Sequence, residues 1–191
     1  NISFNLEINK WIISIPFHRK KIFFDFDKIF YKNGYQKEFP FSIYLLENKF
    51  FRTKYKCLPA PGAKNIKFNL TKNEDSFSIN YDILGFCFWM LNRCEEVTDD
   101  KNFFDGHDRF IGKLSHAFLH NYNKQPIVDE WLLFLGEVIS YSFPSIDIVK
   151  TNFSILPTHD VDNPRRFSLL YKKRIFKNYF QSFKNDLSTK N

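Results

Sequence analysis

The spacing of the hydrophobic residues changes at Asp82, and this change constrains the fold more than any other feature of the sequence. Before it, apolar and polar residues alternate from Ile2 to Asn9, which is the period of a half-buried strand. After it, apolar residues recur at the spacing of one helix face: Ile83, Phe86, Cys87, Met90, Leu91 and Cys94. Asp82 is placed to cap the first turn of that helix. Strands followed by helices predict an α+β domain.

Short strands and turns are expected over residues 1–80. Three further strand candidates are Trp11–Phe17, Ile66–Leu70 and Phe77–Asn80. The last two are expected to form a hairpin around Asn73 to Asp75, and a basic turn from His18 to Lys21 follows the first. The two prolines of Pro59-Ala60-Pro61-Gly62 predict a loop.

A second helix is expected between Pro126, a residue favoured in the first turn, and Pro144. Its predicted apolar face consists of Val128, Trp131, Leu132, Leu135, Val138 and Ile139. Alternating β-branched residues in Asp147 to Leu156 then predict a strand that leads into a polar motif. We therefore expect an N-terminal α+β domain over residues 1–150 and a second unit over residues 151–191.

Composition limits the class of protein. The chain has 191 residues, of which 43% are hydrophobic, so it can form one packed domain, or one domain and part of another, and it is not disordered throughout. Three cysteines, Cys57, Cys87 and Cys94, form no close pair, which fits a reducing compartment, and we expect a cytoplasmic protein. We find neither a secretory signal nor an apolar run near the roughly 20 residues of a membrane span.

Two acids near the end of the predicted strand, Asp160 and Asp162, are two positions apart, a spacing that can form a catalytic or metal-binding site. Residues i and i+2 of an extended segment place both carboxylates on one side, while Val161 points to the other. One carboxylate can ligate a divalent metal while the other takes a proton from a metal-bound water. The same spacing occurs in helix caps and solvated loops, so spacing alone leaves these alternatives open.

The segment Leu156 to Pro164 (LPTHDVDNP) resembles the first motif of the polysaccharide deacetylases, the NodB-homology carbohydrate esterases. The resemblance is to the branch in which T-H-D-V-D replaces T-F-D-D-G. Three upstream segments are similar to the region that often precedes the catalytic domain in that branch: Tyr81–Glu96, Gly106–Phe110 and Pro126–Trp131. The resemblance implies the N-terminal portion of a metal-dependent hydrolase that removes acetyl groups from a carbohydrate substrate.

The resemblance also implies a fold and roles for the two acids. In that family the first acid of the motif is the general base and the later one binds a divalent metal, usually zinc, which here makes Asp160 the catalytic base and Asp162 the metal ligand. Both acids would lie at the C-terminal end of the first strand of a distorted β/α barrel. The implied architecture is an α+β accessory domain followed by the first strand and helix of a truncated α/β barrel. The sugar, the N- or O-linkage of its acetyl group and the oligomeric state stay open.

One departure from the family concerns the metal. The family's second motif, H-x-x-x-H, supplies two more metal ligands after the first motif, and no histidine follows His159. We therefore expect the 191-residue chain by itself to be inactive, because one carboxylate cannot hold zinc. His116 and His120 have a chelating spacing but precede the motif, and we interpret them as a structural pair.

The formal charge of +7 lies after Asp162, where eight bases accompany one acid. The apolar residues of that segment share one helical face, which we interpret as the first helix of the barrel rather than as a membrane-surface contact. The preceding residues are neutral overall, so we expect no nucleic-acid partner.

The alternative function is a non-catalytic module that binds a glycan or a partner, with the deacetylase motif unused. The aromatic richness suits stacking against sugars. However, most of these aromatic residues, among them Trp89 and Trp131, fall on predicted apolar faces and are expected in the core.

Overall fold

The structure is a computed structural model that describes residues 3–32, 39–45, 57–63, 70–149, 153–160, 176–178 and 180–181. The chain divides into two compact units, Asn1–Val149 and Lys150–Asn191, here called unit 1 and unit 2. Among the helices of the described ranges, none is long and apolar enough to cross a bilayer.

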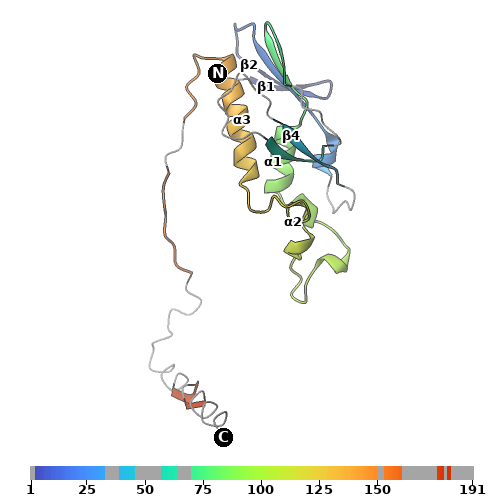
Figure 1. Cartoon of the computed structure of the whole chain (residues 1–191), viewed down its shortest axis with the longest axis vertical. Helices are drawn as coiled ribbons and strands as arrows, with labels where there is room; N and C mark the ends of the chain where they lie inside the picture. Colours follow the sequence, from blue (N-terminus) through green and yellow to red (C-terminus); the bar gives the residue numbers. More distant parts are fainter. Residues whose placement is uncertain are drawn as a thin grey trace. The chain divides into compact units, whose positions relative to one another are not determined.

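Unit 1 contains a five-stranded sheet in the order β1-β2-β3-β7-β6 (Figure 1). Its strands are β1 (Ser3–Glu7), β2 (Lys10–Ser14), β3 (Lys21–Asp25), β6 (Leu70–Asn73) and β7 (Ser76–Ile79). Neighbours run antiparallel except β3 and β7, which run parallel. The first two strands and the hairpin around residues 74 and 75 confirm the sequence prediction. The first strand of that hairpin continues to Asn73, beyond the predicted end at Leu70, and residues 66–69 lie outside the described ranges. Strand β3 was not predicted.

A second sheet pairs β4 (Phe41–Leu45) with β5 (Cys57–Pro61), and it corrects the loop predicted at residues 59–62. Pro59 and Pro61 occupy alternate positions, so the N–H groups that they lack belong to one edge of the strand. At that edge their carbonyls accept hydrogen bonds from Trp131 Nε1 (2.8 Å) and Tyr81 Oη (2.7 Å). Side chains from α3 and from the residue just before the cap of α1 therefore satisfy the carbonyls of the edge that proline leaves without donors.

The helices are α1 (Ile83–Leu91), α2 (His116–Leu119) and α3 (Ile127–Ser142), joined by the 3₁₀ turns η2 (Cys94–Glu96), η3 (Lys101–Phe103) and η4 (Gly112–Leu114). A further 3₁₀ turn, η1 (Lys28–Tyr31), precedes β4 and packs against α1. Helix α3 contacts α1 and the strands β3, β5 and β7. Unit 1 is thus a mixed α+β structure, as the change of period at Asp82 predicts.

The buried face of α3 is rotated from the predicted one. It consists of Ile127, Glu130, Trp131, Phe134, Leu135, Val138, Ile139 and Ser142. Leu132, predicted in this face, is 43% exposed. Helix α1 ends at Leu91, earlier than predicted, because Arg93 has φ of 51° and separates Cys94 from the helix. Leu91, predicted in the buried face, is 71% exposed.

Aromatic side chains fill the space between the sheets and the helices. Phe39 stacks on Trp89 with ring centroids 4.5 Å apart, and Tyr44 meets the Trp131 ring at 4.8 Å. Trp89 and Trp131 are both buried, which confirms their predicted place in the core.

Unit 2 is described mainly by residues 153–160, which are exposed and adopt neither helix nor strand. The strand predicted for residues 147–156 is therefore wrong for its described residues: Ile148 packs against the core of unit 1, and Phe153–Leu156 stay in solvent. A strand needs a neighbour for its N–H and C=O groups, and within the described ranges this segment pairs with none. In the basic segment, residues 176–178 and 180–181 are helical, and the rest lies outside the described ranges.

Candidate functional site

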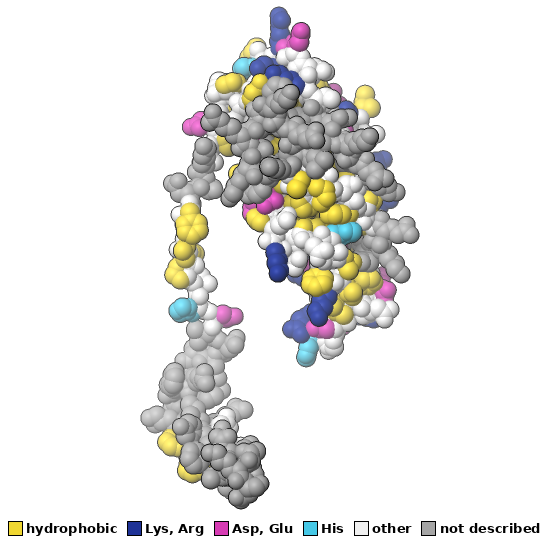
Figure 2. Space-filling model, viewed as in Figure 1, with side chains coloured by type: hydrophobic (Ala, Val, Ile, Leu, Met, Phe, Trp, Pro, Cys, Tyr) yellow, Lys and Arg dark blue, Asp and Glu magenta, His cyan; other side chains and the backbone are white. Residues whose placement is uncertain are grey.

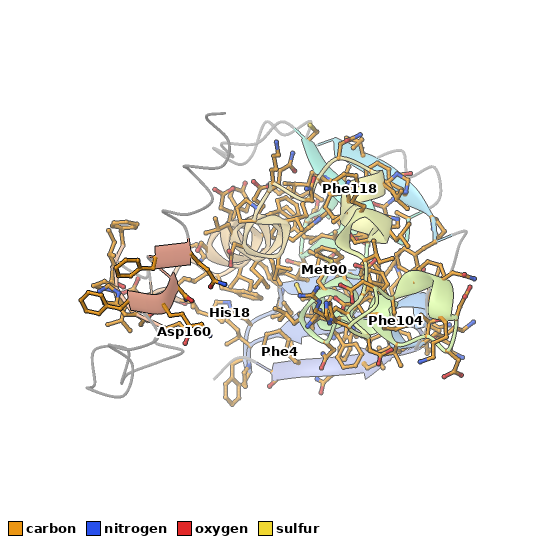
Figure 3. The ribbon with its side chains drawn as sticks, turned by 90° about the horizontal axis from the view of Figure 1, so that it is seen from below. Phe4, His18, Met90, Phe104, Phe118 and Asp160 are labelled. Carbon is orange, nitrogen blue, oxygen red and sulfur yellow. The ribbon has the colours of Figure 1, made fainter. Side chains whose placement is uncertain are left out.

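The structure describes only one of the two acids of the predicted site. Asp160, labelled in Figure 3, is exposed. Asp162 lies outside the described residues. His159 Nδ1 donates to the carbonyl of Thr158 (3.0 Å), which fixes the ring locally. The spacing of the two carboxylates is therefore a sequence prediction that the structure leaves open.

The donors needed by a catalytic zinc are not assembled in the described part of the chain. Such a site takes three protein ligands and a water. No group of three His, Cys, Asp or Glu side chains in the described ranges could hold a metal. The described residues thus do not fit a complete zinc centre, and we assign no chemical step through a metal to them.

His116 and His120 lie close together, and the structure agrees with their structural interpretation. Their ring centroids are 4.3 Å apart. His116 is buried, and its Nε2 donates to the Phe39 carbonyl (3.3 Å) while its Nδ1 accepts from Tyr122 Oη (2.6 Å). Burial lowers the pKa of His116 to about 4, so the ring stays neutral at physiological pH. Both nitrogens are occupied by protein groups, which makes this ring a packing element of the core.

Asp82 is the most deeply buried acid among the described residues, with 1% of its surface exposed. Its Oδ1 accepts from the Gly85 N–H (2.8 Å) and caps α1, and its Oδ2 accepts from the Asp27 N–H (2.8 Å). Burial raises the pKa of Asp82 to about 6, although the two backbone donors oppose that rise. A β-carbon at Gly85 would overlap this carboxylate, so no space for a substrate adjoins it there. Asp82 is a cap that ties α1 to the segment before η1.

A groove of about 500 Å³ lies between the β6–β7 turn and the last turns of α3. We call it the β6–α3 groove. Its polar lining includes Lys20, Lys72, Asn73, Ser76, Ser140 and Tyr141. The floor contains Phe77, whose ring meets the Tyr141 ring edge to face at 5.5 Å. Most of the residues that line the groove are polar or charged, so it differs from the mainly apolar pockets of typical small-molecule sites.

Comparison with known proteins adds a family. The sequence model of a family of unknown function, DUF7033, matches residues 5–144, well over half of the chain. The chain belongs to this family. No curated protein matches, and no solved structure matches.

The match places the site candidates in different parts of the chain. The β6–α3 groove, Asp82 and His116 all lie in the DUF7033 region, whereas the motif with Asp160 and Asp162 follows it. The groove was not predicted from the sequence. The sequence shows a basic turn from His18 to Lys21, but that pattern does not show that Lys20 meets residues more than 50 positions away.

Proposed function

We propose that this chain is the N-terminal portion of a carbohydrate deacetylase, with the DUF7033 region as an accessory domain before the catalytic unit. The observation that carries the proposal is the T-H-D-V-D motif, which begins 14 residues after the family match ends at residue 144. The exposure of Asp160 supports the proposal, because a general base must be accessible to water and substrate.

Each acid has one role in this proposal. Asp160 is the general base, because an exposed carboxylate can accept a proton from a water molecule that attacks the acetyl carbon. Asp162 contributes one ligand to a divalent metal, with zinc the expected ion. Among the described residues, no three His, Cys, Asp or Glu side chains are grouped so that they could hold a metal. The proposal therefore assigns a base and one ligand to this chain, and the 191-residue chain is expected to be inactive by itself.

Acetate release tests the proposal. The protein expressed from its complete coding sequence is incubated with acetylated chito-oligosaccharides and with acetylated xylan. We expect Asp160→Asn to lower the rate by at least about a hundredfold, since general-base catalysis contributes about 10²–10⁴-fold. Asp162→Asn is expected to abolish both activity and bound metal.

The matched control is Asp147→Asn, which removes an exposed carboxylate outside the motif and is expected to leave the rate unchanged. Full activity in Asp160→Asn would overturn the proposed base. Stoichiometric zinc in the purified 191-residue chain would overturn its expected inability to hold the metal. Glycan binding without acetate release would favour the non-catalytic module instead.

A further inference from the structure

Phe17 lies at the tip of the connection between β2 and β3 (residues 15–20), here called the Phe17 turn, with its ring fully exposed to solvent. The His18 N–H donates to the Ile15 carbonyl (3.1 Å), which closes a four-residue turn with Pro16 and Phe17 at its centre. Proline at the first central position and φ of 67° at the second match a type II turn, in which glycine is the usual second residue. Phe17 therefore has a backbone conformation that disfavours its side chain, and its ring adds nothing to the core.

The Phe17 turn is attached to the rest of unit 1 on the side that follows its tip. The His18 ring, labelled in Figure 3, packs against Phe143 at the end of α3, with ring centroids 5.8 Å apart. The Lys21 N–H, where β3 begins, donates to the Asp75 carbonyl (3.0 Å) in the β6–β7 hairpin. Phe17 is not among the residues that line the β6–α3 groove. The fold thus presents the phenyl ring on a supported turn beside the groove rather than inside it.

Basic side chains follow the exposed ring directly. Arg19, Lys20 and Lys21 are consecutive, and none of the ion pairs within the described ranges involves them. Two exposed acids of the β6–β7 turn, Glu74 and Asp75, lie beside them and oppose part of this charge. Figure 2 shows Lys and Arg side chains, with acidic ones beside them, over the end of unit 1 that carries the hairpin in Figure 1. Three bases accompany two acids here, so the positive charge is in excess around the ring.

We infer that the Phe17 turn binds the surface of an anionic lipid bilayer. Phe17 enters the boundary between the headgroups and the acyl chains, and Arg19 and Lys21 bind lipid phosphates. The turn already fixes the ring outward, so insertion buries apolar surface without any rearrangement of the core.

Two other occupants fit the turn less well. A small ligand needs a concave site, and Phe17 lies outside the groove. A single-stranded nucleic acid needs a succession of stacking rings, whereas the Phe17 turn has one phenyl ring, and the neighbouring His18 ring packs against Phe143. The inference does not depend on the proposed deacetylase activity.

Fluorescence quenching tests whether the turn enters a bilayer. Phe17→Trp and Ile8→Trp each add one indole to the 191-residue chain, and the wild type supplies the background of its three tryptophans. Ile8 is the matched position because it is 98% exposed, has φ of 42° and lies in the turn that precedes β2. The vesicles contain equal amounts of phosphatidylcholine and phosphatidylglycerol, with bromine at the headgroup end of the acyl chains. We expect loss of the fluorescence added at position 17 and no loss of that added at position 8.

Vesicle sedimentation and thermal denaturation separate lipid binding from a structural role. Phe17→Gly removes the ring and places glycine where the turn favours it, so its melting temperature should not fall. Its Kd for the vesicles should rise by about tenfold, because the inserted apolar surface is lost. Arg19→Gln and Lys21→Gln should each raise the Kd by about fivefold. The controls Ile8→Gly and Lys113→Gln, an exposed lysine on η4, should leave it unchanged.

Quenching at neither position, or equally at both, would overturn the inference. An unchanged Kd in Phe17→Gly would do so as well, and a lower melting temperature in that variant would give the ring a structural role instead. Equal binding of pure phosphatidylcholine vesicles, or displacement of the vesicles by glycerol phosphate, would exclude an anionic bilayer surface as the ligand. Displacement by oligothymidylate would assign the turn to a nucleic acid. Binding by the basic segment after Asp162 does not imitate the expected result, because the added indole and the Phe17 variants report on the turn alone.

Discussion

Unit 1 and the described segment of unit 2 contain the same kinds of apolar side chain in opposite surroundings. Phe24 and Phe86 are completely buried in unit 1, whereas Phe153 is 90% and Leu156 is 86% exposed. The acids differ in the same way, since Asp82 is buried under two backbone donors and Asp160 lies in solvent. In unit 1 the sheets and helices cover Phe24 and Phe86, although Phe17 and Ile8 of the same unit are exposed, whereas every described residue from Phe153 to Asp160 is exposed. Hydrophobic content alone therefore does not decide which side chains of this chain are buried.

Amide hydrogen exchange should show the largest difference between the two regions. Amides in the middle of α3 are hydrogen bonded within a buried helix, so they should exchange only when unit 1 opens, at least about a thousandfold more slowly than in an unfolded peptide. Amides of residues 153–160 have no regular secondary structure and should exchange at nearly the unfolded rate. Mass spectrometry of peptic fragments measures both. Strong protection in residues 153–160 would contradict the structure and restore the predicted strand.

Removal of one large aromatic side chain from each region should give the next largest contrast. Trp131→Ala removes a fully buried ring and its hydrogen bond to the Pro59 carbonyl, and should lower the free energy of unfolding by about 3–5 kcal/mol. Phe153→Ala should change it by less than about 0.5 kcal/mol, because the ring is already in water. Urea denaturation measures both changes. Trp131→Phe, which keeps much of the bulk but removes the donor, should fall between them; equal effects of Trp131→Ala and Phe153→Ala would contradict the comparison.

The sequence predicted those parts of unit 1 that depend on local patterns. Strands β1 and β2 follow from the spacing of apolar residues and the β6–β7 hairpin from its turn residues, and Asp82 caps α1 as its position before the helical period indicates. Strand β3 was missed because Ile22-Phe23-Phe24 is a continuous apolar run without alternation. Strand β5 differs from the predicted loop because its two prolines lie at a sheet edge that needs no N–H donors, where Trp131 and Tyr81 donate to their carbonyls. That compensation comes from residues distant in the sequence.

The candidate sites also differ in whether they depend on local sequence or on tertiary contacts. The T-H-D-V-D motif with Asp160 and Asp162 occupies five consecutive residues, so a sequence resemblance can find it. The β6–α3 groove depends on Lys20, Lys72 and Tyr141, which meet only after β3, β7 and α3 have packed together. Charge counts conceal it as well, because bases and acids balance over residues 1–162. A site built from tertiary contacts therefore cannot be found from the sequence pattern alone.

Two glycines test how tightly unit 1 is packed around its buried acid. A β-carbon at Gly85 would lie 2.9 Å from Phe30 Cδ2 and overlap the Asp82 carboxylate, so Gly85→Ala should lower the free energy of unfolding by about 2 kcal/mol. At Gly136, in the middle of α3, a β-carbon would lie 3.8 Å from Ile148 Cδ1, which is an ordinary van der Waals contact. Gly136→Ala should raise stability by about 0.5–1 kcal/mol, because alanine favours the helix. Thermal denaturation of both variants measures the difference, and equal shifts would show that the Asp82 cap tolerates displacement.

The pH dependence of stability should separate the buried acid from the exposed one. Burial raises the pKa of Asp82 to about 6, while in the unfolded chain the group has its ordinary value near 3.8. Between these two values the folded protein binds more protons, so the free energy of unfolding should fall as the pH rises from about 4 to about 6, by about 2 kcal/mol for this group. The Asp82→Asn variant lacks this titration, so its free energy of unfolding should fall less between pH 4 and pH 6. Its free energy of unfolding at pH 4 should be lower than that of the wild type, because an amide offers only one acceptor atom for the two N–H groups. Asp160→Asn, the matched change at an exposed carboxylate, should follow the wild-type curve. Urea denaturation at pH 4, 5, 6 and 7 measures the three curves. Parallel curves for the wild type and Asp82→Asn would mean that burial does not raise the pKa of Asp82. The contrast between the buried and the exposed acid would then be lost.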